Sequence, residues 1–109
     1  MFRLFYISTA ALGTTNDICD SIARVSARNN AEHDITGALV FNGVNFAQVL
    51  EGDETAVRTL FDIICSDPRH SGVVLVSAKP AKRRNFEGWA MQRIDGLNLV
   101  PLAEKLIDD

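Results

Sequence analysis

The stretch ITGALVFNGVNFAQVLEG, residues 35–52, decides how this chain folds. Its first part, from Ile35 to Phe41, is a nearly continuous apolar run, and Asn42-Gly43 is a strong signal for a β-hairpin turn. The chain then returns from Asn45 to Glu51 as the partner strand. We therefore expect an antiparallel hairpin in the middle of the chain.

The second arm of this hairpin carries a glutamine among core residues. Strand alternation puts Phe46, Gln48 and Leu50 on one face, so the amide shares the side of two large apolar groups. A buried amide without partners costs about 1–3 kcal/mol. Either Gln48 bonds locally to neighbouring backbone, or it meets a polar group that the sequence does not show.

Two amphipathic helices flank the hairpin in the sequence. The first is capped by Thr15 or Asn16 and runs to about Asn30, and the second is capped by Asp53 and ends before Pro68. The expected core positions are Ile18, Ile22 and Val25 in the first helix and Val57, Leu60, Phe61 and Ile64 in the second.

Three further strands and a terminal helix complete the pattern. The aromatic and branched run from Phe2 to Ser8 predicts a first strand. Val73 to Ser77, apolar on both faces, predicts a central strand covered on both sides. A last strand is expected from about Asn85 to Gln92, and Pro101 is suited to the first turn of a short C-terminal helix.

This order is β-α-β-β-α-β-β. It predicts an α+β fold of the ferredoxin-like kind, a mixed sheet with both long helices on one face and the short C-terminal helix available for the other. We expect one domain over residues 1–95, followed by a C-terminal tail or short helix over residues 96–109. At 109 residues the chain is long enough to bury a core without metal or disulfide support.

Composition excludes several classes of function. With 47% hydrophobic and 23% charged residues and no long apolar tract, the chain is expected to be soluble, to cross no membrane and, without a secretory signal, to be cytoplasmic. A net charge of −3 with scattered basic residues makes nucleic acid an unsuitable main partner. The two cysteines and two histidines form no zinc pattern, so no metal site is expected.

The chain also lacks the usual motifs of enzymes. There is no Gly-rich phosphate loop, no G-x-S-x-G and no convincing Cys or Ser with a His and acid partner. We therefore expect that the protein is not an enzyme. One enzymatic alternative is a small hydrolase resembling acylphosphatases, in which Arg69 would hold phosphate, but no phosphate-cradling glycine loop supports it.

What remains is a set of polar residues at positions where apolar ones are expected. Tyr6 lies in the first strand, Asn29 and Asn30 end the first helix, and Gln48 lies in the hairpin. Each has a simple local explanation: a core tyrosine bonded to backbone, a left-handed helix cap, a locally paired amide. Only their combination suggests a shared partner.

The same holds for two further pairs of residues. Arg69-His70 after Pro68 would be a solvated loop in most proteins, and Trp89 with Met91, two apart in the expected last strand, would simply be core. Together with the polar residues named above, however, they belong to a series of short sequence motifs that follow one another in a specific order. These motifs are Tyr6 followed by Ser8, then SARNN, ITGALVF, NFAQVLEG, SDPRH and NFEGWAM.

This series resembles the BLUF domains, blue-light sensors that hold a flavin, usually FAD. The likeness covers Leu4 to Met91. It implies that the flavin ring lies between the two long helices with one edge toward the sheet. Asn30 would hydrogen-bond the polar edge of the ring at N3 and C4=O, with Asn29 nearby. Arg69 and His70 would reach the C2=O side of the ring and the ribityl chain.

The resemblance also implies the remaining roles. Ile22, Ile35 and Leu39 are weaker candidates for packing against the ring. Tyr6 and Gln48 would be the photoactive pair: excited flavin takes an electron from Tyr6, Gln48 relays the proton, and the amide is left rotated, tautomerised or both. Trp89 and Met91 would relay this change to an effector protein in trans, or to a change in a homo-oligomer.

Two points stay open from the sequence. The flavin can be FAD, FMN or riboflavin. The chain can also be a BLUF-like module that binds other proteins without flavin or light response, although the presence of Tyr6, Asn30, Gln48 and Arg69 speaks against this alternative.

Overall fold

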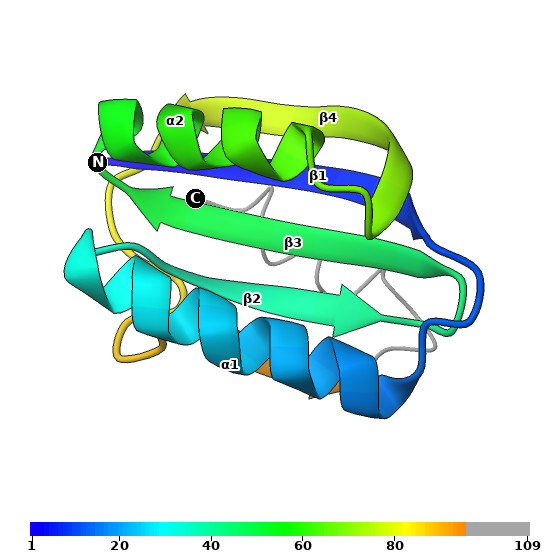
Figure 1. Cartoon of the computed structure of the whole chain (residues 1–109). Helices are drawn as coiled ribbons and strands as arrows, with labels where there is room; N and C mark the ends of the chain where they lie inside the picture. Colours follow the sequence, from blue (N-terminus) through cyan, green and yellow to red (C-terminus); the bar gives the residue numbers. More distant parts are fainter. Residues whose placement is uncertain (96–109) are drawn as a thin grey trace.

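A five-stranded mixed sheet with two helices on one face forms the body of the protein in the computed structural model, which describes residues 1–95 (Figure 1). The elements follow in the order β1 (Phe2–Ala10), α1 (Asn16–Glu32), β2 (Thr36–Phe41), β3 (Asn45–Gly52), α2 (Glu54–Cys65), β4 (His70–Pro80) and β5 (Gln92–Asp95). The strands lie side by side as β4-β1-β3-β2-β5. All pairs are antiparallel except β2 with β5, which are parallel. The predicted α+β, ferredoxin-like order is confirmed.

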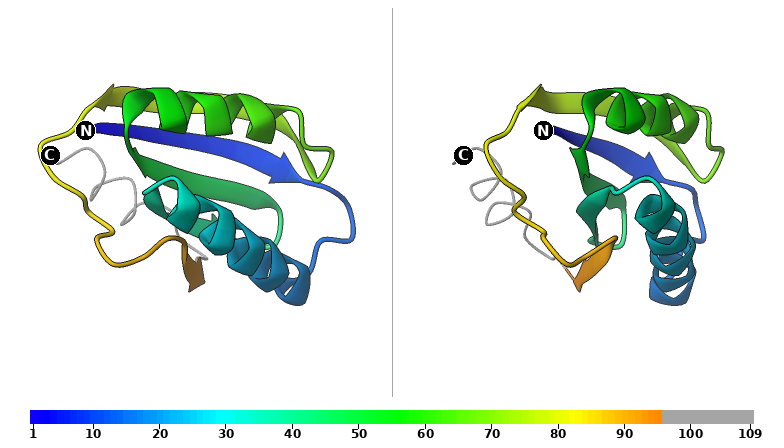
Figure 2. Two further views of the ribbon diagram at one scale, coloured as in Figure 1. Left: turned by 60° about the vertical axis from the view of Figure 1, so that its left-hand side comes forward. Right: turned by 90° about the vertical axis from the view of Figure 1, so that its left-hand side faces the viewer.

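Side-chain caps begin both helices where the sequence predicts them. The Thr15 hydroxyl accepts the Ile18 amide at 3.2 Å, and the Asp53 carboxylate accepts the Ala56 amide at 3.1 Å. Each bond satisfies one of the amides that a first helical turn leaves without a partner. The two helices then run over the same face of the sheet, as the two turned views in Figure 2 show.

Strand alternation divides the sheet into two apolar faces. The helix side carries Leu4, Tyr6, Leu39, Phe41, Phe46 and Leu50, packed against Cys19 and Ala23 of α1 and Val57 of α2. The opposite side carries Phe5, Ala38, Val40, Ala47 and Val49, and Phe86 joins them from the segment before β5. Gln48 lies on the helix side, as its alternation with Phe46 and Leu50 predicts.

The prediction of a central strand at Val73–Ser77 is wrong. This run belongs to the longer β4, which is the edge strand beside β1. Its middle residues Val74, Leu75 and Val76 are 54%, 46% and 52% exposed within the structure. A continuous apolar run is typical of a strand covered on both sides, but position in a sheet follows from pairing, and β1 is already paired to β3 on its other side.

The last strand also differs from the prediction of Asn85 to Gln92. β5 begins only at Gln92, and the residues before it form turns. Gly88 has a φ of +85°, a conformation that interrupts an extended strand, and the Trp89 amide bonds back to the Phe86 carbonyl at 3.0 Å. Trp89 is therefore 52% exposed in a turn and is not a core residue of a strand.

The segment from Ala81 to Met91 links the two margins of the sheet. It leaves β4 at one edge, crosses the face away from the helices, where Phe86 is buried, and reaches β5 at the other edge (Figure 2). Neither helix of residues 1–95 is long and apolar enough to span a membrane. The short helix expected from Pro101 lies outside the described residues.

Candidate functional site

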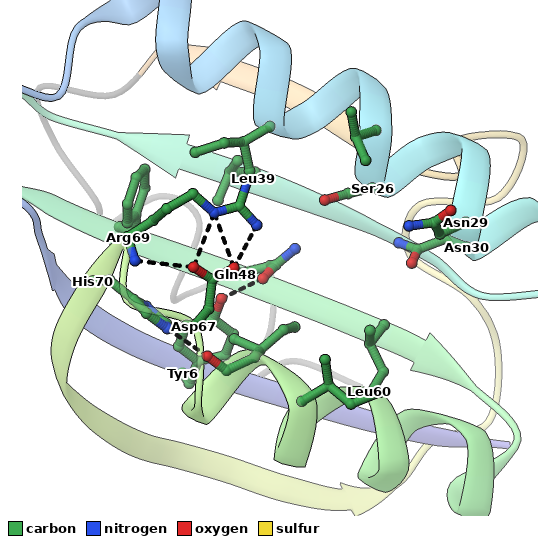
Figure 3. Close-up of a pocket in the computed structure, with 15 residues that line it drawn as sticks. Tyr6, Ser26, Asn29, Asn30, Leu39, Gln48, Leu60, Asp67, Arg69 and His70 are labelled. Carbon is green, nitrogen blue, oxygen red and sulfur yellow. Dashed lines mark hydrogen bonds and ion pairs between the residues drawn. The ribbon is translucent and has the colours of Figure 1, made fainter.

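A cavity of about 160 Å³ lies between α1, α2 and the sheet. One water needs about 10–15 Å³ by the same measure, so the cavity has room for an organic ligand and not only for a single ion. Its walls are Tyr6, Ile22, Val25, Ser26, Asn29, Asn30, Leu39, Phe46, Gln48, Leu60, Ile63, Ile64, Asp67, Arg69 and His70. Figure 3 shows polar side chains from both helix ends and from the sheet around this space.

Tyr6 and Gln48 face each other at the floor of the cavity. They are directly opposite in the β1–β3 register, and the Tyr6 hydroxyl donates a short hydrogen bond to Gln48 Oε1. Both side chains are buried. The Tyr6 ring also packs against Phe61 of α2, with ring centroids 5.5 Å apart. Pairing across the strands thus fixes the phenol and the amide relative to each other.

The environment of Tyr6 favours the neutral phenol. Burial raises the pKa of Tyr6 well above its ordinary value, and the nearby Cys65 and Asp67 act in the same direction. Tyr6 therefore keeps its proton over the physiological range, and that proton points at Gln48 Oε1. This answers the question that the sequence left open: the partner of Gln48 within the protein is a phenol.

The amide nitrogen of Gln48 is less well satisfied. Among residues 1–95, Nε2 has one acceptor, the Met91 sulfur at 3.6 Å. A thioether is a weak acceptor, whereas an amide nitrogen carries two strong N–H donors. Since Gln48 lines the cavity, this donor capacity is available to an acceptor placed there.

Asn30 supplies a hydrogen-bond acceptor at the cavity, where Gln48 supplies a donor. It is 2% exposed, and its Nδ2 donates to the Ala90 carbonyl at 3.0 Å. Within the described part of the chain its Oδ1 accepts no hydrogen bond. The left-handed residue after α1 is Asp34, with a φ of 54°, and the residue that caps the helix is His33. The explanation of either asparagine as a left-handed cap is therefore wrong, and Asn29 is an exposed residue at the cavity wall.

Arg69 and His70 lie at the start of β4 on the α2 side of the cavity. The Arg69 guanidinium pairs with Asp67, and this hydrogen bond holds the pKa of the Asp67 carboxyl below its usual range. The His70 ring lies between Ser8 Oγ, 2.7 Å from Nδ1, and the Ile64 carbonyl, 2.7 Å from Nε2. Since a carbonyl only accepts, Nε2 carries a proton, and in the neutral ring Nδ1 then accepts from the Ser8 hydroxyl.

The apolar walls differ in part from the expected ones. Ile22 and Leu39 line the cavity, but Ile35 does not: it is buried in the core beside Gly52. Ile18 and Val25 are half-exposed because the buried side of α1 is Cys19, Ala23 and Asn30. Of the expected core stripe of α1, Ile22 and Val25 thus line the cavity and Ile18 does not.

Sequence reasoning missed several wall residues. These are Val25, Ser26, Phe46, Leu60, Ile63, Ile64 and Asp67 as cavity residues. The helical spacing of Ile22, Ser26 and Asn29 could have found one of them, since residues three and four apart share a helix face.

Met91 and Trp89 occupy different environments. Met91 is buried on the helix side and contacts Gln48, whereas Trp89 is half-exposed and its carbonyl accepts the Gly37 amide at 3.0 Å. A Cβ on Gly37 would lie 2.0 Å from the Val49 carbonyl oxygen. Only glycine permits this close approach of β2 to β3, which also presents the Gly37 amide to Trp89.

Comparison with known proteins identifies the family of the chain. The family model of BLUF, sensors of blue-light using FAD, matches residues 1–92, and the chain belongs to this family. It is 37% identical over 76 residues to the blue light- and temperature-regulated antirepressor BluF of Escherichia coli. The dark-state structure of the BLUF protein BlrB superposes with a TM-score of 0.83 at 33% identity, covering 98% of this chain and 83% of that one.

Other relatives carry the domain inside larger proteins. The chain is 37% identical over 89 residues to the photoactivated adenylate cyclase subunit beta of Euglena longa. The matches cover 70% and 81% of this chain but only 19% of the antirepressor and 10% of the cyclase subunit. A structure of Klebsiella pneumoniae BlrP1 with FMN and cyclic diGMP aligns with a TM-score of 0.81 at 35% identity, over 97% of this chain and 29% of that one.

Proposed function

We propose that this protein is a blue-light photoreceptor that binds a flavin non-covalently in the cavity between α1 and α2. One observation carries the proposal: two buried amides at the cavity, Gln48 and Asn30, each keep hydrogen-bonding capacity that residues 1–95 do not use. Both residues line the cavity, so a ligand placed there can use this capacity. A flat ring with carbonyl and N–H groups on one edge supplies partners to both.

The residues of the cavity fit such a ring. Asn30 Oδ1 would accept the ring N–H, and Asn29 lies nearby on the same helix end. Gln48 Nε2 would donate to a ring carbonyl or nitrogen, and Ile22 and Leu39 would pack against the apolar surface. This set combines acceptor, donor and apolar walls as small-ligand sites do.

The ribityl side of the ligand would meet Arg69 and His70. Asp67 holds the Arg69 guanidinium beside the cavity opening. The family description names FAD, and FMN occurs in a BlrP1 structure. We propose FAD as the natural ligand, with FMN and riboflavin as acceptable substitutes because the groups inside the cavity contact the part that all three share.

When bound, the flavin would absorb blue light and supply an acceptor for one electron. Tyr6 is the donor in this scheme: it is neutral and buried, and its proton already points to Gln48 Oε1. Loss of an electron from the phenol would pass this proton to Gln48, and its return would leave the amide rotated or tautomerised. Either outcome exchanges the donor and acceptor that Gln48 presents.

This exchange would reach the protein surface through Met91. If the Gln48 amide turned its oxygen toward the Met91 sulfur, the contact between Nε2 and that sulfur at 3.6 Å would be lost. The segment that carries Met91 and the exposed Trp89 would then shift. We propose that a separate effector protein, or a second copy of the chain, reads this change, and that the domain itself performs no catalysis.

The test is the Gln48→Leu variant. We expect a protein that still purifies yellow but whose flavin absorption no longer shifts to the red under blue light, because leucine keeps the volume and removes both amide groups. The matched control is Gln92→Leu, since Gln92 lies opposite Ala38 in β5, on the other face. A colourless wild-type protein, or a normal photocycle in Gln48→Leu, contradicts the proposal.

A further inference from the structure

The segment between β4 and β5 is attached to the sheet at two ends by bonds of unequal strength. At the cavity end, Gln48 Nε2 contacts Met91 Sδ at 3.6 Å, and Asn30 Nδ2 donates to the Ala90 carbonyl at 3.0 Å. The Gly37 amide also donates to the Trp89 carbonyl at 3.0 Å. All three are bonds between neutral groups, and one acceptor is a sulfur. This end can change partners at small cost.

The other end is bound to a carboxylate. Glu51 of β3 is 0% exposed, and its two carboxylate oxygens accept the backbone amides of Phe86 at 2.7 Å and Asn85 at 3.0 Å. Hydrogen bonds to an ionised acceptor are about twice as strong as neutral ones. The segment is therefore held more firmly at Asn85 and Phe86 than by the side-chain contacts at its cavity end.

The carboxylate itself is fixed from the sheet. Arg3 Nε of β1 donates to Oε2 at 3.2 Å, and the Thr36 hydroxyl of β2 donates to Oε1 at 3.0 Å. Strands on both sides of β3 thus hold Glu51, and each of its oxygens has two donors. A buried charge with this many partners has little freedom to move.

Arg84 strengthens the same end. Its guanidinium donates to Thr36 Oγ1 at 2.8 Å, to the Glu51 carbonyl at 3.1 Å and to the Asp34 carbonyl at 2.8 Å. The Arg3 side chain also donates to the Arg83 carbonyl at 2.6 Å. The two arginines before Phe86, Arg83 and Arg84, are therefore part of this attachment.

Both ends of the segment are attached to one strand. Gln48 and Glu51 lie three residues apart on β3, and strand alternation puts them on opposite faces. A change at Gln48 cannot move Phe86 while Glu51 holds it. Among residues 1–95, Glu87 to Met91 are held to the rest of the protein by bonds between neutral groups, so the displacement falls on them.

We propose that Glu51 is a positioning residue of the light response: it anchors the 81–91 segment at Asn85 and Phe86, so that a change at Gln48 is confined to residues 87–91 and displaces Trp89. The anchor itself stands on the contacts above. Its role under illumination rests on the proposed function.

The first experiment measures the anchor in the dark. Amide hydrogen exchange at Asn85 and Phe86 should be about 10- to 100-fold faster in Glu51→Gln than in wild type, the change expected when a hydrogen bond to a buried charge is lost. Glu54→Gln is the matched control, because Glu54 is an exposed carboxylate of α2 paired with Arg58. Unchanged exchange at both amides in Glu51→Gln overturns the anchor.

The second experiment measures the response in the light. Trp89 is the only tryptophan of the chain, so its fluorescence reports the 87–91 segment without labelling. In wild type and Glu54→Gln we expect the Trp89 emission to differ between dark and lit protein. In Glu51→Gln this difference should fall by at least about half, because an unanchored segment samples both arrangements in the dark.

The flavin spectrum separates the two proposals. The red shift of flavin absorption depends on Gln48 and Tyr6, so it should remain in Glu51→Gln. An intact red shift with an unchanged Trp89 difference overturns the role of Glu51 alone. A wild-type protein without any red shift overturns the proposed function, while the exchange data still decide the anchor.

A paired variant covers the case in which Glu51→Gln does not fold. That change removes the Glu51 carboxylate from the buried ion pair with Arg3, and breaking a buried ion pair is strongly destabilising, whereas replacing a whole buried ion pair by apolar residues is often neutral. Arg3→Met with Glu51→Leu removes the anchor and the charge together. It should show the same faster exchange and reduced Trp89 difference, and wild-type values in this variant overturn the proposal.

Discussion

Replacing Tyr6 by phenylalanine removes one hydroxyl oxygen from the floor of the cavity. The ring contact with Phe61 stays, because phenylalanine keeps the ring. Gln48 Oε1 loses the hydroxyl that donates to it, its one donor among residues 1–95. The variant should fold, bind flavin and lack the light-induced red shift.

The cost in stability follows from the unsatisfied acceptor. A buried carbonyl without a donor costs about 1–3 kcal/mol, so the free energy of unfolding of the flavin-free protein should fall by about that amount. For a domain of this size about 1 kcal/mol corresponds to roughly 4–8 °C in Tm. Bound flavin at about 100 times its Kd adds back about 2.7 kcal/mol, which keeps the variant measurable.

The assay combines urea unfolding of the flavin-free protein with dark and lit absorption spectra of the loaded protein. Ser8→Ala is the matched control: Ser8 lies two residues along the same face of β1, but its hydroxyl bonds His70 and not Gln48. It should keep the red shift. A full red shift in Tyr6→Phe would refute the reasoning that the phenol drives the change at Gln48.

Two further predictions test the protonation of Tyr6 and the role of Asn30. Because burial raises the folded-state pKa of Tyr6, the only tyrosine, its ultraviolet absorption should show no tyrosinate at pH values near the ordinary phenol pKa of about 10. The stabilisation by the neutral phenol is complete below that pH and is lost as pH rises toward the raised folded value; tyrosinate appearing near pH 10 in folded protein contradicts this. Asn30→Ala should weaken flavin binding about tenfold or more in an equilibrium titration, which corresponds to a loss of about 1.4 kcal/mol in binding free energy. Asn29→Ala, at the exposed neighbouring residue, should weaken binding less. Equal effects of the two substitutions would contradict the different roles assigned to the two amides.

The order of elements could be predicted because local signals agree with the final structure. The Asn42-Gly43 turn, the caps Thr15 and Asp53 and the face of Gln48 all follow from rules that act within a few residues. The prediction for β4 was wrong because the position of a strand in the sheet depends on pairing between distant residues. The apolar run in β4 looks like a buried strand, but its neighbours place it at an edge.

The candidate site shows the same division. Tyr6 and Gln48 could be placed on one face from alternation alone, but their direct opposition depends on the register of β1 and β3. Ile35 was expected at the ring because it begins an apolar run, and it lies instead in the core away from the cavity. The separation of Trp89 from Met91 depends on the positive φ of Gly88, which the sequence does not reveal.

The link from β4 to β5 has a mechanical consequence of its own. Consecutive strands of the chain form the two outermost margins of the sheet, so this link must span the full breadth of the molecule. On its way across, the link is fixed to β3 where the Glu51 carboxylate accepts the amides of Asn85 and Phe86. The number of residues between Phe86 and β5 therefore limits how far this link can move toward an effector protein.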